Sequence, residues 1–125
     1  MIDDEIIGMT REHFEGLFPK VCLNCGRRFE TLREYILETR RIGMTICHDA
    51  ESGDWETTQP LGGVALANCS CGTTMALTTD GMPLSQIHLA LKWIKEESQQ
   101  RGLNPNDLLD YIRSEVRKRV LNDPV

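Results

Sequence analysis

Two short cysteine turns constrain the fold of this 125-residue chain more than any other feature. Residues 22–26 read CLNCG and residues 69–72 read CSCG, so each turn carries two thiols and then a glycine. A turn that wraps a metal ion often needs a positive φ after its second cysteine, and glycine adopts that angle without steric cost. Two facing turns present four sulfurs in a tetrahedron, the arrangement that zinc accepts. The pattern predicts a structural Zn²⁺ site, with iron as the alternative ion, held by Cys22, Cys25, Cys69 and Cys71.

Both turns resemble zinc-ribbon and rubredoxin-type cysteine knuckles, although the second is one residue shorter than the C-x2-C-G pattern of those families. Residues 22–35 also resemble the first half of the zinc finger that uses two cysteines and two histidines, and Phe29 stands at the matching spacing. That second resemblance ends at Glu38, where the family has its first histidine. The resemblance to knuckles implies a small zinc-ribbon-like sheet, and no family is identified over the whole chain.

The fifth cysteine and its neighbour lie midway between the two turns. Cys47 and His48 could each replace a ligand from the short second turn, or Cys47 could be a spare thiol that senses oxidants. On a strand they would point to opposite faces, so they would not bind together. We expect Cys47 to be buried, His48 to lie at the surface, and neither to hold the metal.

Charge and hydropathy exclude several classes of protein. The net charge is −5, and residues 1–80 hold seven Lys and Arg against thirteen Asp and Glu. This balance argues against nucleic-acid binding, despite five arginines between residues 27 and 41. No apolar run approaches the roughly 20 residues of a membrane span, and the acidic start differs from a signal peptide. We therefore expect a cytoplasmic protein, in which paired cysteines favour metal binding over disulfides.

The hydrophobic periodicity predicts an α+β fold: a small zinc-ribbon-like sheet with one inserted helix, plus a C-terminal helical hairpin. A boundary at Asp80-Gly81 divides the chain into a cysteine-knuckle domain, 1–80, and a helical part, 81–125. Gly and Pro residues and apolar spacing set the expected elements. Helices are expected at 2–18, 31–41, 83–100 and 105–121, and strands at 44–49, 55–59, 64–67 and 73–79, with the first two strands paired as a hairpin.

These features favour a non-enzymatic, zinc-stabilised interaction or regulatory module over an enzyme, because four cysteine ligands leave the metal no position for water. The alternatives are a redox sensor or electron carrier at the cysteine site and, less favoured, a nucleic-acid-binding protein. The expected partner is another protein or a second copy of the chain. Leu89 and Trp93 lie on a second apolar side of the first C-terminal helix, which favours a homodimer.

Overall fold

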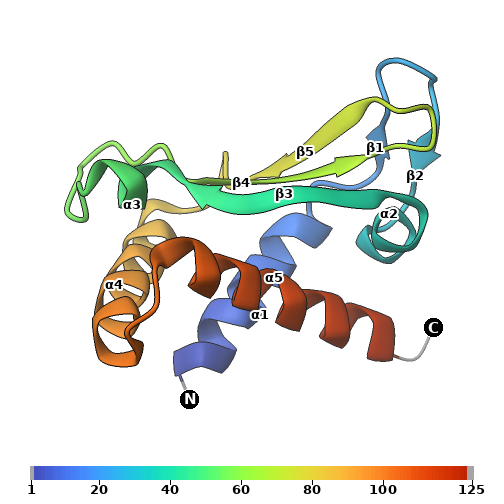
Figure 1. Cartoon of the computed structure of the whole chain (residues 1–125). Helices are drawn as coiled ribbons and strands as arrows, with labels where there is room; N and C mark the ends of the chain where they lie inside the picture. The colour runs from blue at the N-terminus through green and yellow to red at the C-terminus, as the bar shows by residue number, and fades with distance from the viewer. Residues whose placement is uncertain (1, 124–125) are drawn as a thin grey trace.

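The structure is a computed structural model that describes residues 2–123, and it forms two layers (Figure 1). A three-stranded antiparallel sheet makes one layer, and helices cover one of its faces. In chain order the elements are α1 (Ile2–Glu15), β1 (Lys20–Val21), β2 (Arg28–Phe29), α2 (Leu32–Glu38), β3 (Arg40–Cys47), α3 (His48–Ser52), β4 (Gly63–Asn68), β5 (Thr74–Thr78), α4 (Leu84–Arg101) and α5 (Pro105–Asn122).

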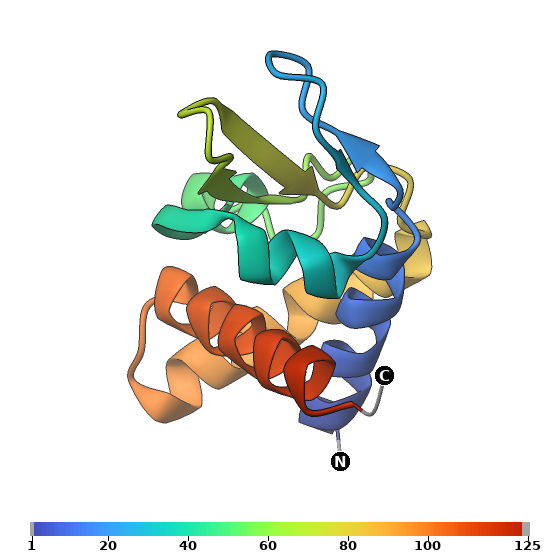
Figure 2. The same cartoon turned by 90° about the vertical axis from the view of Figure 1, so that its right-hand side faces the viewer.

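The main sheet has the order β3-β4-β5, and β4 and β5 alternate between buried and more exposed side chains over most of their length. The register pairs Ala67 with Met75 and Ala65 with Leu77, and all four side chains are buried. Because successive strand residues point to opposite faces, this alternation fixes which face meets the helices. β1 and β2 form a separate two-stranded ladder at one end of the molecule, which Figure 2 shows above α2.

The helices share one hydrophobic cluster with the sheet and the cysteine turns. Ile7 of α1, Trp93 of α4 and Leu108 of α5 belong to the same buried cluster as Cys22 and Cys69. The two segments divided at residue 80 therefore both contribute to this cluster, and their division into two domains stays a prediction. The expected α+β class is confirmed, with α4 and α5 joined by a turn at Gly102, whose φ is 65°.

The predicted hairpin of strands 44–49 and 55–59 is wrong. β3 begins earlier, at Arg40, and pairs with β4, while the chain enters the short helix α3 at His48. Asp49 explains the difference, because its buried carboxylate accepts hydrogen bonds from the amides of Leu61 (2.9 Å) and Gly62 (2.8 Å). That side chain satisfies the backbone of a loop and replaces the ladder that a hairpin would supply.

Candidate metal centre

The first cysteine turn is the connection between β1 and β2. The carbonyl of Cys22 accepts a hydrogen bond from the amide of Gly26 (2.9 Å), and the amide of Cys22 donates to the carbonyl of Arg27 (2.8 Å). Gly26 has a φ of 78°, as the trailing glycine was predicted to require. Phe29, fully buried beneath the turn, meets Tyr35 edge to face at 5.5 Å between ring centroids. Packing therefore anchors the turn that carries Cys22 and Cys25.

The second cysteine turn is the tight connection between β4 and β5. The amide of Gly72 donates to the carbonyl of Cys69 (2.8 Å), and the amide of Cys69 donates to the carbonyl of Thr73 (2.9 Å). Gly72 has a φ of 91°, so this turn also uses the conformation that favours glycine. The missing residue of the C-x-C-G sequence makes this turn one residue tighter than the first. It still directs the thiols of Cys69 and Cys71 towards the first turn.

The four predicted residues come together in space. One ligand atom from each of Cys22, Cys25, Cys69 and Cys71 lies within 4.8 Å of every other. The Sγ atoms of Cys22 and Cys71 are 3.7 Å apart, and those of Cys25 and Cys69 are also 3.7 Å apart. A tetrahedral zinc ion with bonds of about 2.3 Å separates its sulfurs by about 3.8 Å. The cluster could therefore hold a metal ion between the two turns.

The surroundings shift the pKa values of two of the clustered thiols in opposite directions. Side-chain hydrogen bonds from Thr73 and Asn24, with the Thr73 amide, lower the pKa of Cys71 to about 5. The Arg27 amide lowers the pKa of Cys25, but burial and hydrogen bonds with the three neighbouring thiols outweigh this effect. The net pKa of Cys25 is therefore raised above its ordinary value, to about 11. Four thiolates so close together repel one another, and a divalent cation removes that repulsion.

Two polar contacts at the centre went unnoticed in the sequence. Asn24 Nδ2 lies 3.5 Å from the sulfur of Cys71, and the Thr73 side chain lowers the pKa of the same thiol. Asn24 precedes Cys25, and Thr73 follows Gly72 at the end of the second turn, so a short polar donor next to a metal-ligand motif is the signal that could have found them. Such donors orient and stabilise thiolate ligands.

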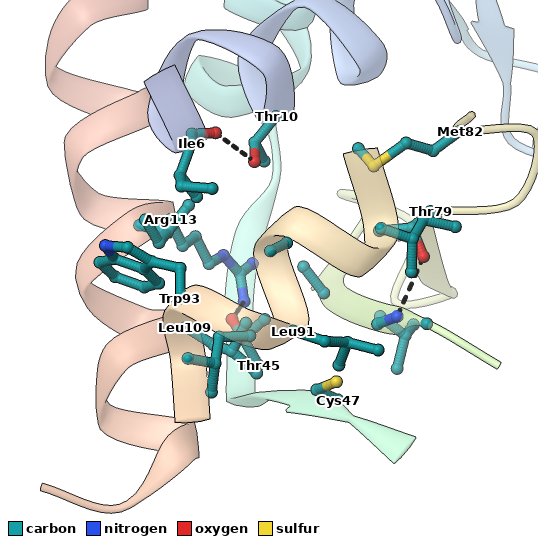
Figure 3. Close-up of a pocket in the computed structure, with 18 of the residues that line it drawn as sticks. Ile6, Thr10, Thr45, Cys47, Thr79, Met82, Leu91, Trp93, Leu109 and Arg113 are labelled. Carbon is teal, nitrogen blue, oxygen red and sulfur yellow. Dashed lines mark hydrogen bonds between the residues drawn. The ribbon is translucent and has the colours of Figure 1, made fainter. Parts of the chain in front are cut away.

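Cys47 and His48 do not belong to the cysteine cluster in the part of the chain that the structure describes. Cys47 is buried, and it lines an apolar cavity of about 100 Å³ between the sheet and helices α1, α4 and α5. Figure 3 shows its sulfur on the same side of that cavity as Leu91. Burial raises the pKa of the Cys47 thiol, which disfavours the thiolate that an oxidant sensor needs. His48 is exposed at the start of α3, as expected.

The arginines near the first turn make structural contacts. Arg27 stacks over the ring of Phe29 at 4.9 Å and pairs with Glu38 at 3.4 Å. Arg33 donates to the carbonyls of Val120 (3.2 Å) and Leu121 (3.1 Å), near the C-terminal end of α5. A side chain engaged in this way is less available to contact phosphate groups, which does not favour the nucleic-acid alternative.

Among the helices of residues 2–123, none combines the length and the apolar character that a membrane crossing requires. No protein-family model, curated protein or solved structure shows significant similarity to this chain.

Proposed function

We propose that the chain is a non-enzymatic interaction or regulatory module whose fold is stabilised by one zinc ion. The observation that carries this proposal is the cluster of four sulfurs, brought together from two turns whose cysteines lie 44 to 49 residues apart in sequence. Zinc suits four thiolates in a tetrahedron, and structural zinc contributes directly to folding free energy. With every position taken by sulfur, the ion would have none left for a catalytic water.

Zinc would hold together the elements at one end of the molecule. β1 and β2 are two residues each, and so short a ladder is unstable without further support. Bonds from Cys22 and Cys25 to a shared ion would fasten this ladder to the β4–β5 turn. The protein would then present a rigid end, which suits recognition of another protein. Leu23, at the tip of the first turn, is 98% exposed.

The test is elemental analysis of the full chain purified without added metal. We expect one zinc per chain in the wild type and in Cys47→Ala, because Cys47 lies outside the cluster. Cys25→Ser should lose the zinc and melt at a lower temperature, since metal-binding energy is also folding energy here. Stoichiometric zinc and unchanged melting in Cys25→Ser would disprove the ligand assignment. Loss of zinc from Cys47→Ala would show that Cys47 is a ligand.

A second candidate, a redox sensor or electron carrier, is favoured by one observation. Cys25 and Cys71 are exposed, so oxidants or electron-transfer partners can reach two of the four sulfurs. Iron bound to four thiolates would give a coloured protein, whereas zinc would not. An absorption spectrum of the purified chain, and zinc release during mild oxidation, would distinguish the two candidates.

A further inference from the structure

A second cavity, of about 90 Å³, lies between the sheet and helices α1, α2 and α5. Its charged lining is entirely cationic: Arg41, Arg113 and Arg117. We call it the arginine cavity. Asp110 pairs with Arg41 at 2.5 Å, so these four side chains together carry a charge of +2 (three cations less one anion). In a chain of net charge −5, this concentration of positive charge calls for an explanation.

Arg113 is half-buried, and within residues 2–123 it forms no ion pair with a carboxylate. Its guanidinium donates to the carbonyl of Leu66 (2.8 Å) and, over a longer distance, to the hydroxyl of Thr45 (3.4 Å), a contact that Figure 3 shows. A guanidinium has five N–H donors, so three remain without an acceptor in the part of the chain that the structure describes. Burial, followed by repulsion from Arg41, lowers the pKa of Arg113. Each of these effects would be relieved by an anion beside the guanidinium.

Tyr35 supplies an independent observation in the same cavity. Its side chain is 3% exposed, and its hydroxyl has no hydrogen-bond partner among residues 2–123. A buried hydroxyl without a hydrogen-bond partner lowers the stability of the fold. Its presence therefore indicates a bound group that accepts a hydrogen bond from it. Burial raises the pKa of Tyr35 to about 12, although Arg113 opposes the shift, so the hydroxyl remains a donor at neutral pH.

The remainder of the lining is mostly apolar. Phe14, Ile36, Leu77 and Val116 lie on its walls. These side chains would cover a short hydrocarbon group and could not hydrate a doubly charged ion such as phosphate. A carboxylate carries one charge, and its two oxygens match the fork of a guanidinium. The volume is smaller than the roughly 150 Å³ cavity that holds benzene in an engineered protein, which limits the apolar part to a few carbon atoms.

We propose that the arginine cavity binds a small organic carboxylate, with its oxygens on Arg113 and the Tyr35 hydroxyl and its short apolar group against Ile36 and Leu77. Arg117, one helical turn after Arg113 on α5, adds attraction from the rim. This site is separate from the cysteine centre and does not depend on the zinc proposal.

The test uses the full chain and butyrate as the probe, followed by NMR titration and thermal melting. Butyramide, which has the same shape without the charge, and inorganic phosphate, which has charge without an apolar group, are the comparison compounds. We expect butyrate to bind and to raise the melting temperature, and both comparison compounds to bind at least ~10-fold more weakly, as charged hydrogen bonds and apolar burial predict. Equal binding of butyrate and butyramide, or no butyrate binding, would overturn the proposal.

Variants then locate the site. Tyr35→Phe removes only the hydroxyl, so without ligand it should melt at the wild-type temperature or higher, yet bind butyrate ~10-fold more weakly or worse. Arg117→Gln should also weaken binding, while Tyr111→Phe and Lys118→Gln, which change exposed groups outside the cavity, should not. Unchanged butyrate affinity in Tyr35→Phe would place the ligand elsewhere and refute the assignment. Because Arg117 is exposed, its variant tests the site even if changes at Arg113 prevent folding.

Discussion

At the scale of single residues, Asp3 connects the start of the chain to α4. Its carboxylate accepts hydrogen bonds from the indole Nε1 of Trp93 (2.8 Å) and from Arg101 (2.9 Å). Burial raises the pKa of Asp3, but these hydrogen bonds and the charge of Arg101 outweigh it, so the net pKa lies below its ordinary value. The carboxylate therefore stabilises the fold only while it is ionised.

This arrangement predicts a specific dependence of stability on pH. A carboxyl group with a lowered folded pKa adds stability above its unfolded pKa of about 3.9 and loses it as the pH falls through the folded value. Asp3→Asn should lower the free energy of unfolding by about 1–3 kcal/mol at pH 7, and its difference from wild type should shrink below about pH 4. Denaturant unfolding followed by tryptophan fluorescence measures both quantities.

The matched control for this change is Asp4→Asn. Asp4 is exposed and pairs with Arg119 at the surface, so its loss should cost at most about 1 kcal/mol. A difference between Asp3→Asn and wild type that stays constant from pH 7 to pH 3 would show that Asp3 contributes through packing and not through its charge.

At the scale of elements, a glycine in the second cysteine turn and a glycine in α1 differ in backbone conformation, so alanine should have opposite effects at the two positions. Gly72 adopts a φ of 91°, whereas Gly8 lies inside α1, and a Cβ added at either position would meet no atom within 4 Å. The effect of alanine at these sites therefore comes from the backbone alone. Gly72→Ala should destabilise the fold by about 1–2 kcal/mol, and Gly8→Ala should stabilise it by about 0.5–1 kcal/mol.

Thermal melting of the two variants beside wild type checks this prediction, and zinc content should fall only in the variant with a strained turn. If Gly72→Ala melted like wild type and retained its metal, the positive φ after the second cysteine would have no role in shaping the site.

Local signals in the sequence predicted much of this architecture, because they depend on neighbouring residues. Thr31 caps α2 by accepting from the Glu34 amide (3.1 Å), and Asn104 caps α5 by accepting from the Asp107 amide (2.9 Å), and both are residue types that favour this position. The Glu34 carboxylate in turn accepts a hydrogen bond from the amide of Glu30 (3.3 Å), the residue before the cap.

The elements that depend on distant contacts could not be predicted in this way. The pairing of β3 with β4 spans the loop that Asp49 organises, and no short-range pattern encodes that carboxylate's partners twelve and thirteen residues later. The arginine cavity was missed for the same reason, because Tyr35 and Arg113 meet only through the packing of α2 and α5 on the sheet. The four cysteines were found because each pair is local, and only their facing arrangement required the fold.

At the scale of the whole molecule, the apolar side of α4 at Trp93 is covered within the chain and is not free to form a homodimer. The Trp93 side chain is only 3% exposed and belongs to the shared core. Self-association stays a prediction, and the apolar side chains available for it on the last two helices and their turn are Leu84, Leu103 and Tyr111.

Sedimentation velocity over a wide range of concentrations measures this association. Dimer formation should be weakened by Leu103→Ser, which alters an exposed side chain, and should be unaffected by Leu23→Ser at the opposite, cysteine-bearing end. A single monomeric species at the highest concentration would contradict self-association and leave a different protein as the partner.

The two cysteine turns lie on either side of loop 53–62 in the sequence. A cut in this loop would leave two fragments, each of which keeps one complete cysteine pair and one side of the β3–β4 ladder. A metal ion shared between the pairs would then hold the two fragments together, because it would link them through four coordinate bonds at a point remote from the cut. With such an ion in place, the chain between the two cysteine turns would form a closed loop, and the N- and C-terminal segments would extend from it as two tails.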